Sequence, residues 1–395
     1  MEQALILVGG RGTRLGSLTK HLPKPMMEID GRPFVEILIQ HVARHKFSEI
    51  ILLCGYLSKG IYSAFHGKTL WGARITCLVE RDPMGTGGAL LQAKNLLKDQ
   101  FLLVNGDSFF DFNLLDLNTV PVNKAWLGKM ALRPLLETGR YGTVTIKEER
   151  VTAFSEKSTV GPGLVNGGVY IFKRAVLDYI QQLPCSLERD VLPKLAERGQ
   201  LFGRSYHGYF IDIGVPQDLL RARADLKNRN RPVVFFDRDG VLNHDEGYTY
   251  RINDFKWIFG AINAIKRCND RGWFVIVVTN QSGIARGFYD ESAVEDLHEW
   301  MQEELKTKGA HIDAFYYCPH HPEGVITEFS ISCGCRKPEP GMLIKALSEW
   351  PIDISRSALI GDKQSDIDAA SRVGIRGMLY QGQDLLGLVD SVTCC

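Results

Sequence analysis

The sequence predicts an α/β protein of two domains that join near residue 230. Its 395 residues exceed the size of one ordinary domain, which has about 100–200 residues. Short apolar runs alternate with amphipathic helical stretches, the pattern of strand–helix–strand units around a parallel sheet. This alternation restarts in the second half, with no sequence repeat between the halves. We therefore expect two different domains, residues 1–229 and 230–395.

In the first half, the apolar runs at residues 4–9, 50–55 and 101–107 are expected to be buried strands, and each ends in glycine or aspartate. Residues 34–46 have helical periodicity and lie between the first two runs. Ligands of such sheets bind at the carboxyl ends of strands. The residues that follow each run are therefore the candidates for function.

The second half begins after a basic, polar segment at residues 227–231, which is the best linker candidate and is closed by a proline. Further strands are expected within residues 233–240, 273–280 and 357–362, because each segment is an apolar run that continues into polar residues. This second series predicts a sheet of its own.

Composition excludes several classes of protein. The net charge of +1 gives no bulk attraction to nucleic acid or to an anionic membrane surface. No apolar run reaches the roughly eighteen residues of a membrane helix, and the start of the chain has no basic region or cleavage site of a signal peptide. The nine cysteines are expected to be reduced thiols in the cytoplasm. Small molecules are the expected partners, and assembly as a homo-oligomer stays open.

A glycine-rich loop follows the first run and carries two cations. Its backbone N–H groups can cradle phosphates, although it matches neither a P-loop nor the dinucleotide fingerprint. A purely structural turn is the alternative. The cations suit a triphosphate, since the departing pyrophosphate gathers negative charge. The expected substrate-binding residues are Gly9, Gly10, Gly12 and Thr13, with Arg14 and Lys24 in catalytic roles.

Residues 9–15 with Pro23-Lys24-Pro25-Met26 resemble the signature of the sugar-1-phosphate nucleotidyltransferases, and further motifs at residues 80–89, 104–107 and 210–218 extend the resemblance over roughly residues 1–225. The resemblance implies a Rossmann-like nucleotidyltransferase fold and a reaction that releases pyrophosphate. It also implies a loop that reads the base and a pocket for the sugar phosphate, in which Ser158 stands where the family usually has proline. The residues implied are Glu80 and Gly85 for the base, Glu156 for sugar hydroxyls, Lys157 for the acceptor phosphate, and Asn166.

The same resemblance makes Asp107 and Asp212 the metal ligands of the first site. Each could instead be a helix cap or a turn residue. Magnesium usually takes only one or two carboxylates, with phosphate and water completing its shell. Two aspartates at strand ends meet that need. Glu80 is expected to read guanine, because its carboxylate can accept from the two adjacent N–H donors of that base.

In the second half, Asp237 and Asp239 stand two residues apart after a buried strand, so both can reach one substrate phosphate. One carboxylate can attack phosphorus, and the other can protonate the leaving group and activate water. Asp–x–Asp pairs are also common on surfaces. Three later segments support catalysis: Thr279-Asn280, Arg336-Lys337 and the acidic run that begins at Asp362.

Together these segments resemble the four motifs of the haloacid dehalogenase superfamily, which implies a Rossmannoid fold. In that family magnesium lies between the nucleophile, the backbone carbonyl of the second aspartate and the late aspartate. The resemblance therefore implies magnesium ligands Asp237, Asp239 and Asp362. It implies phosphate-binding roles for Thr279, Asn280 and Lys337.

Cys318, His320, Cys333 and Cys335 form two close pairs. Four sulfur and nitrogen ligands suit a structural zinc, because such sites are closed and four-coordinate. Free buried thiols are the alternative. The sequence therefore predicts a zinc-binding loop just before Arg336 and Lys337.

Residues 232–380 resemble the histidinol-phosphate and heptose-bisphosphate phosphatase branch, and the heptose phosphatases more closely. Within this branch Arg286 and Arg336 are expected to bind substrate phosphate. Removing the C7 phosphate of heptose 1,7-bisphosphate yields heptose 1-phosphate, which a nucleotidyltransferase with GTP converts to GDP-heptose and pyrophosphate. A bifunctional enzyme of nucleotide-activated heptose synthesis is therefore expected. The alternatives are a histidinol-phosphate-type phosphatase fused to a mannose-1-phosphate-type guanylyltransferase, and a regulatory protein with one degenerate domain.

Overall fold

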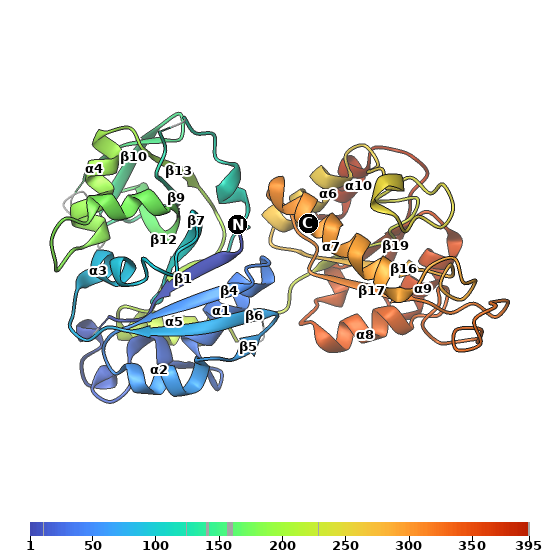
Figure 1. Ribbon diagram of the computed structural model, residues 1–395, viewed down its shortest axis with the longest axis horizontal. Coiled ribbons are helices and arrows are strands. Elements are labelled where there is room, and N and C mark those ends of the chain that lie inside the picture. The colour runs from blue at the N-terminus through green and yellow to red at the C-terminus, as the bar shows by residue number, and fades with distance from the viewer. Residues whose placement is uncertain (11, 124, 140–141, 156–160, 228, 394–395) are drawn as a thin grey trace. The chain divides into compact units, whose positions relative to one another are not determined.

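The computed structural model describes residues 1–395 except 11, 124, 140–141, 156–160, 228 and 394–395 (Figure 1). The chain divides into two compact units, Met1–Lys227 and Asn228–Cys395, and each is described by itself. Among the described residues, no helix has both the length and the apolar character needed to cross a membrane.

The first unit contains a ten-stranded sheet with the order β10-β11-β13-β9-β12-β7-β1-β4-β6-β5. Its parallel centre consists of β1 (Gln3–Leu7), β4 (Glu49–Cys54), β6 (Ala73–Val79) and β7 (Gln100–Asn105). The remaining strands are β5 (Thr69–Leu70), β9 (Gly128–Leu135), β10 (Thr143–Lys147), β11 (Arg150–Ser155), β12 (Gly163–Lys173) and β13 (Leu201–Ser205).

The expectation of a parallel sheet is therefore right for the centre of this sheet and wrong for much of its other half, although β13 pairs with β9 in parallel. β12 runs antiparallel to both β7 and β9, and β10 runs antiparallel to β11. The turn between β10 and β11 passes through Glu148 and Glu149, which both have positive φ. A tight turn of this kind returns the chain directly, whereas a parallel neighbour requires a long crossover.

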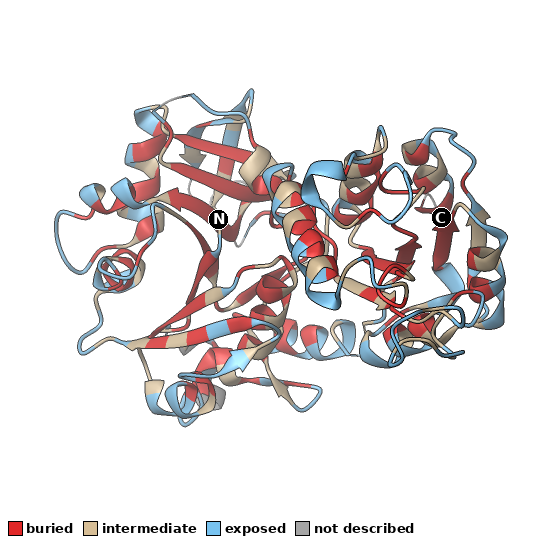
Figure 2. Ribbon diagram, turned by 45° about the vertical axis from the view of Figure 1, so that its right-hand side comes forward, coloured by how far each residue is buried: buried red, intermediate tan, exposed pale blue. Residues whose placement is uncertain are grey.

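Helices cover both faces of the first sheet, and alternate strand residues face opposite cores (Figures 1 and 2). On β1, Ala4 and Ile6 belong to one buried cluster and Leu5 to the other. The first cluster includes residues of α1 (Phe34–Arg44), α2 (Ser58–Phe65) and α5 (Pro216–Asp225). The second includes residues of α3 (Gly85–Gln92) and α4 (Leu192–Glu197).

The second unit is a five-stranded parallel sheet with the order β17-β16-β15-β18-β19. The strands are β15 (Val233–Phe236), β16 (Phe274–Asn280), β17 (Ala314–Cys318), β18 (Ala358–Gly361) and β19 (Arg376–Leu379). One face packs against α6 (Ala261–Asp270), α7 (Glu291–Thr307) and α10 (Leu385–Thr393). The other packs against α8 (Gly341–Glu349) and α9 (Gln364–Arg372).

Two small pairings and several short turns complete the fold. The pairings join β2 (Glu28–Ile29) to β3 (Arg32–Pro33) and β8 (Ser108–Phe110) to β14 (Phe210–Asp212). The second pairing sets Asp212 opposite Ser108, so the chain segments that carry the two predicted metal ligands of the first unit lie side by side. The short 3-10 helices are Thr13–Thr19, Lys24–Met26, Asp116–Thr119, Arg174–Tyr179, Ile252–Asp254 and Ile354–Arg356, and a π-helical turn covers Leu187–Val191.

Candidate active sites

A cavity of about 490 Å³ opens in the first unit, at the carboxyl ends of the parallel strands. Many residues expected to bind nucleotide line it: Gly9, Gly10, Gly12, Arg14, Lys24, Glu80, Gly85 and Asp107. Gly85 has a φ of +77°, and a Cβ at this position would lie 2.3 Å from the carbonyl oxygen of Cys185. The turn that brings this backbone to the cavity therefore requires glycine.

Lys24 lies between the two predicted metal ligands of this unit, of which Asp107 lines the cavity and Asp212 is not among its lining residues. Its Nζ is 2.8 Å from Asp107 Oδ2 and 3.3 Å from Asp212 Oδ1, and the lysine is 4% exposed. Burial and the charge of Asp107 raise the pKa of Asp212 above its ordinary value. The cluster is therefore a compact set of charges in which a buried ammonium group stabilises two close carboxylates.

Glu80 and Asn166 differ in their surroundings. Glu80 lines the cavity, and burial raises the pKa of its carboxyl group. The amide of Asn166 is engaged within β12: its Nδ2 donates to Tyr170 Oη at 2.5 Å, and its Oδ1 accepts from Gly168 N at 3.0 Å. Asn166 is not among the residues that line the cavity. Its side chain supports the irregular stretch of β12 between Asn166 and Tyr170.

Three expectations about this unit concern residues that the structure leaves undescribed. Glu156 and Lys157 lie outside the described residues, as does the side chain of Thr13.

The cavity also contains a carboxylate that sequence reasoning missed, Glu188. Its Oε2 accepts hydrogen bonds of 3.0 Å from the hydroxyls of Thr86 and Ser186. Nothing in the local sequence distinguishes Glu188 from other acidic residues at a helix start.

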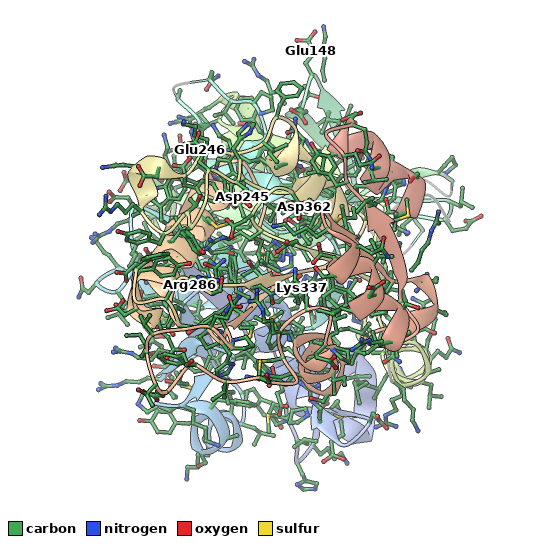
Figure 3. The ribbon with its side chains drawn as sticks, turned by 90° about the vertical axis from the view of Figure 1, so that its right-hand side faces the viewer. Glu148, Asp245, Glu246, Arg286, Lys337 and Asp362 are labelled. Carbon is green, nitrogen blue, oxygen red and sulfur yellow. The ribbon has the colours of Figure 1, made fainter. Side chains whose placement is uncertain are left out.

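The second unit has a cavity of about 290 Å³ at the carboxyl ends of β15, β16 and β18. Lys337 lines it, and Figure 3 shows this side of the unit, with Lys337, Asp362 and Asp245 labelled. The lining combines expected and unexpected residues: Asp237, Asp239, Asp245, Tyr248, Thr279, Asn280, Gln281, Tyr289, Arg336, Lys337, Lys363 and Asp366.

Lys337 is the central cation of this cavity. Its Nζ lies 2.9 Å from Asp237 Oδ1 and 2.6 Å from Asp366 Oδ1, and it donates to Val278 O at 2.8 Å. Burial alone would lower the pKa of Lys337, but the two carboxylates raise it, so the side chain stays charged. Burial raises the pKa of Asp237 to about 7, against the opposing effect of Lys337.

Asn280 fixes the backbone of Lys337. Its Nδ2 donates to Lys337 O at 3.1 Å, and its Oδ1 accepts from Lys337 N at 3.0 Å. Thr279 is 1% exposed, and its Oγ1 accepts from Gln281 Nε2 at 2.9 Å. Both residues line the cavity, and Asn280 also determines where the lysine stands.

Asp239 is surrounded by donors. Its Oδ1 accepts from Arg238 Nε at 3.1 Å and from Asn243 Nδ2 at 3.0 Å. Its Oδ2 accepts from Arg238 Nη2 at 3.0 Å and from Gln281 Nε2 at 2.9 Å. Burial would raise the pKa of Asp239, but the charge and hydrogen bonds of Arg238, with those of Asn243 and Gln281, hold it below its ordinary value. These contacts stabilise Asp239 as a carboxylate.

Three carboxylates at this edge of the sheet could hold a metal ion. Asp237 and Asp366 line the cavity, and Asp362 is not among its lining residues. Oxygen atoms of Asp237, Asp362 and Asp366 lie within 4.8 Å of one another. Asp362 Oδ1 is buried and has no hydrogen-bond partner among the described residues. Gly240 has a φ of +89°, and a Cβ there would lie 2.5 Å from Asp362 Oδ2. Hard oxygen ligands packed this closely fit magnesium.

The expected magnesium set comprises the side chains of Asp237 and Asp362 and the backbone carbonyl of Asp239, and it stays a prediction. Asp237 and Asp362 belong to the carboxylate cluster, whereas the side chain of Asp239 does not. Asp366 belongs to it and was not among the expected ligands. Its position at the start of α9 conceals this role in sequence, because an aspartate there is also a helix cap, and Asp366 Oδ2 does accept from Lys363 N at 3.0 Å.

The predicted cysteine and histidine ligands come together. Cys335 Sγ lies 3.2 Å from Cys333 Sγ, 3.3 Å from Cys318 Sγ and 3.4 Å from His320 Nδ1. All four ligand atoms lie within 4.8 Å of one another. The set can hold one metal ion with four ligands, and its chemistry suits zinc.

Of the two arginines expected to bind phosphate, Arg336 lines the cavity and Arg286 does not. Arg286 Nη2 lies 3.3 Å from His321 Nε2 and 3.9 Å from Glu323 Oε2, on the loop that leaves β17. His321 therefore contacts Arg286, whereas its neighbour His320 belongs to the cluster with the three cysteines. Arg336 Nη1 donates to His320 O at 3.3 Å.

Comparisons with known proteins agree with this division. Residues 3–229 match the nucleotidyl transferase family, and residues 334–383 match the HAD-hydrolase-like family. The chain is 44% identical over 162 residues to a D-glycero-beta-D-manno-heptose-1,7-bisphosphate 7-phosphatase of Rhodopseudomonas palustris, covering 41% of this chain and 90% of that protein. The enzyme of the same name from Escherichia coli K12 is 44% identical over 156 residues, which cover 39% of this chain and 82% of that enzyme.

A solved structure resembles the first unit. HddC from Yersinia pseudotuberculosis is 29% identical, with a TM-score of 0.52, and the match covers 57% of this chain and all of that chain. The same protein, with the same identity, coverage and TM-score, has been solved in complex with GMP-PN.

The two folds and their strand-end sites define a bifunctional enzyme, with a nucleotidyltransferase first and a phosphatase second. The chain belongs to the nucleotidyl transferase family through its first unit, and through its second unit to the HAD-like phosphatase family of the relatives named above.

Proposed function

We propose that this enzyme carries out two steps of nucleotide-activated heptose synthesis. The second unit hydrolyses the C7 phosphate of D-glycero-D-manno-heptose 1,7-bisphosphate, and the first unit transfers a guanylyl group from GTP to heptose 1-phosphate. The products are GDP-heptose and pyrophosphate. The names of the phosphatase relatives support the sugar, and GMP-PN bound to HddC supports a guanine nucleotide.

One observation carries the phosphatase half of the proposal: Asp237, Lys337 and Asp366 meet at the carboxyl ends of parallel strands. Asp237 directly follows β15, so rigid backbone aims its carboxylate at a bound phosphorus. Lys337 offsets the negative charge that grows on the phosphoryl oxygens. Asp239 serves as the acid for the leaving sugar oxygen and then as the base for water.

The chemistry of the two units fits one sequence of reactions. A phosphatase that spares the C1 phosphate delivers a sugar 1-phosphate, which is the acceptor that a sugar-1-phosphate nucleotidyltransferase uses. The direct test supplies heptose 1,7-bisphosphate together with each nucleoside triphosphate and identifies the nucleotide sugar by mass spectrometry. GDP-heptose is expected. A different nucleotide sugar, or phosphate release from histidinol phosphate only, would contradict the proposal.

Both active sites are expected to use magnesium. In the first unit Asp107 and Asp212 would hold it, and in the second Asp237 and Asp362 would, with the backbone carbonyl of Asp239. The carboxylate cluster adds Asp366 as a further candidate. Bound magnesium would neutralise phosphate oxygens as charge moves during transfer.

A structural zinc is expected at Cys318, His320, Cys333 and Cys335. Cys333→Ser should release it and loosen the adjacent chain that carries Arg336 and Lys337, because metal binding stabilises the fold around its ligands. We expect purified wild-type protein to contain one zinc per chain and the variant to contain none, as measured by elemental analysis. Cys268→Ser is the matched control, since Cys268 lies in the apolar core away from the cluster. Wild-type protein without stoichiometric zinc would contradict the prediction.

Glu80→Gln should weaken the use of GTP selectively. Guanine offers N1–H and N2–H₂ as adjacent donors, and the Glu80 carboxylate can accept from both. An amide presents one acceptor and one donor, so one guanine donor is left unpaired, which binding sites penalise strongly. The measurement is kcat/KM for GTP, ATP, UTP and dTTP in both proteins. A wild-type preference for ATP or UTP would show that Glu80 does not read guanine.

A further inference from the structure

Arg238, the residue between the two catalytic aspartates, has the largest side chain among the fully buried residues described for this chain. A buried guanidinium is costly unless its donors are paired. Its Nε and Nη2 form a two-pronged contact with both oxygens of Asp239, at 3.1 and 3.0 Å. This planar fork fixes the orientation of the carboxylate as well as its position.

The guanidinium is itself anchored from two other segments. Its Nη2 donates to Thr249 O at 2.6 Å, and its Nη1 lies 3.3 Å from His298 Nε2 on α7. A guanidinium can only donate, so Nε2 of His298 is the acceptor and the ring is neutral there. Burial lowers the pKa of His298 well below its ordinary value, consistent with that form. His298 also stacks on Phe315 of β17, with ring centroids 4.2 Å apart.

Among the other donors to Asp239, Gln281 lines the cavity and has further partners of its own. Gln281 Nε2 also contacts Thr279 Oγ1 at 2.9 Å, and Gln281 Oε1 accepts from Tyr289 Oη at 2.8 Å. Gln281 lines the cavity and retains these partners if a substrate displaces it from Asp239. The fork of Arg238, in contrast, lies entirely behind the cavity wall, since Arg238 is 0% exposed.

We infer that Arg238, braced by His298, is a positioning residue of the phosphatase reaction that aims Asp239 at the leaving oxygen. The inference rests on the proposed role of Asp239. Asp239 rests as a carboxylate, so it must first take up one proton from solvent as the negatively charged phosphate binds beside it. In the first step an Asp237 oxygen bonds to phosphorus, the bond from phosphorus to the sugar oxygen breaks, and that oxygen receives this proton from Asp239. In the second step Asp239 takes a proton from water, whose oxygen bonds to phosphorus and releases Asp237. Both proton transfers need the carboxyl group in one orientation.

Leaving groups of different basicity separate positioning from damage to the fold. The nitrophenolate of p-nitrophenyl phosphate departs without protonation, whereas a sugar alkoxide requires it. For Arg238→Met we expect the rate of phosphoenzyme formation from heptose 1,7-bisphosphate to fall roughly a hundredfold, with little change in KM. The burst of nitrophenolate should fall far less. Arg238→Lys keeps the charge without the fork and should lie between the wild type and Arg238→Met.

The contact between His298 and Arg238 is tested by substitution of His298. Rapid-quench experiments measure two rates, phosphoenzyme formation from the sugar substrate and nitrophenolate release from p-nitrophenyl phosphate. His298→Leu should slow phosphoenzyme formation from the sugar substrate about tenfold, and His298→Gln, which keeps an acceptor, should restore most of it. Val294→Ala, a buried change on the same helix, is the packing control and should leave the ratio of the two rates as in wild type.

The inference would be overturned if Arg238→Met lowered the rate equally with the sugar and the nitrophenyl leaving groups. It would also be overturned if His298→Leu and His298→Gln formed the phosphoenzyme at the same rate. Thermal unfolding followed by circular dichroism reports the integrity of the second unit in each variant. If wild-type protein hydrolyses fructose 1,6-bisphosphate but not heptose 1,7-bisphosphate, the proposed substrate is wrong, and the comparison of leaving groups proceeds with the former. If wild-type protein forms no phosphoenzyme from a sugar bisphosphate or from p-nitrophenyl phosphate, both the proposed phosphatase function and the inference about Arg238 are wrong.

Discussion

Replacing Asp237 by asparagine is expected to remove phosphate release from heptose 1,7-bisphosphate completely. An amide cannot form the acyl phosphate that an aspartate forms, so the covalent route is lost. Water is not expected to take over as the nucleophile in the variant, because this position is nearly buried. Asp237 is 6% exposed, and its Oδ1 lies 2.9 Å from Lys337 Nζ. Phosphate release by a continuous assay and trapping of the phosphorylated residue by acid quench are the measurements.

The matched variant is Asp239→Asn, which leaves the nucleophile in place. It should slow both formation and hydrolysis of the phosphoenzyme, yet phosphate should still be trapped on Asp237. Nucleotidyl transfer from heptose 1-phosphate supplied directly should be unchanged in both variants, because that chemistry uses residues of the other unit. Phosphate trapped on Asp239, or substantial turnover by the Asp237→Asn protein, would overturn the assignment of roles.

Much of this site could be predicted from sequence because parallel strands end at one edge of a sheet. Asp237, Thr279 and Asp362 stand at or just after the ends of β15, β16 and β18, which are neighbours in the sheet. An apolar run followed by a polar residue is visible in a sequence, and the topology then brings those residues together. The cysteine and histidine set is visible for a similar reason, since its two short spacings limit where the ligands can go.

The features that could not be predicted from the sequence depend on the direction in which a side chain points and on strand pairing between distant segments. Arg238 faces inward and holds Asp239, although a residue between two cavity aspartates would be expected to face solvent. Arg286 faces the loop after β17 rather than the cavity. The antiparallel pairings of β12 were missed because its partners β7 and β9 are distant from it in sequence.

Removing either Asp107 or Asp212 is expected to abolish nucleotidyl transfer and to leave phosphatase activity intact. The two carboxylates come from segments 105 residues apart and meet because β14 pairs with β8. Each interacts with Lys24 Nζ, and the alanine variants leave that buried ammonium with one carboxylate fewer. Losing a ligand for the proposed magnesium and unbalancing this cluster should together lower kcat at least about a thousandfold.

Asparagine variants at the same positions separate charge from shape. Asp107→Asn and Asp212→Asn keep the size of the side chain and an oxygen for Lys24, but an amide is a poorer ligand for magnesium than a carboxylate. We expect them to be almost as inactive as the alanine variants, and to bind magnesium more weakly in calorimetric titrations with GTP. Asp178→Ala, an exposed aspartate of the same unit, is the control. Asparagine variants that retain wild-type transfer would show that the two aspartates only position Lys24, because the amide oxygen would suffice for that contact, and the magnesium assignment in this unit would then be wrong.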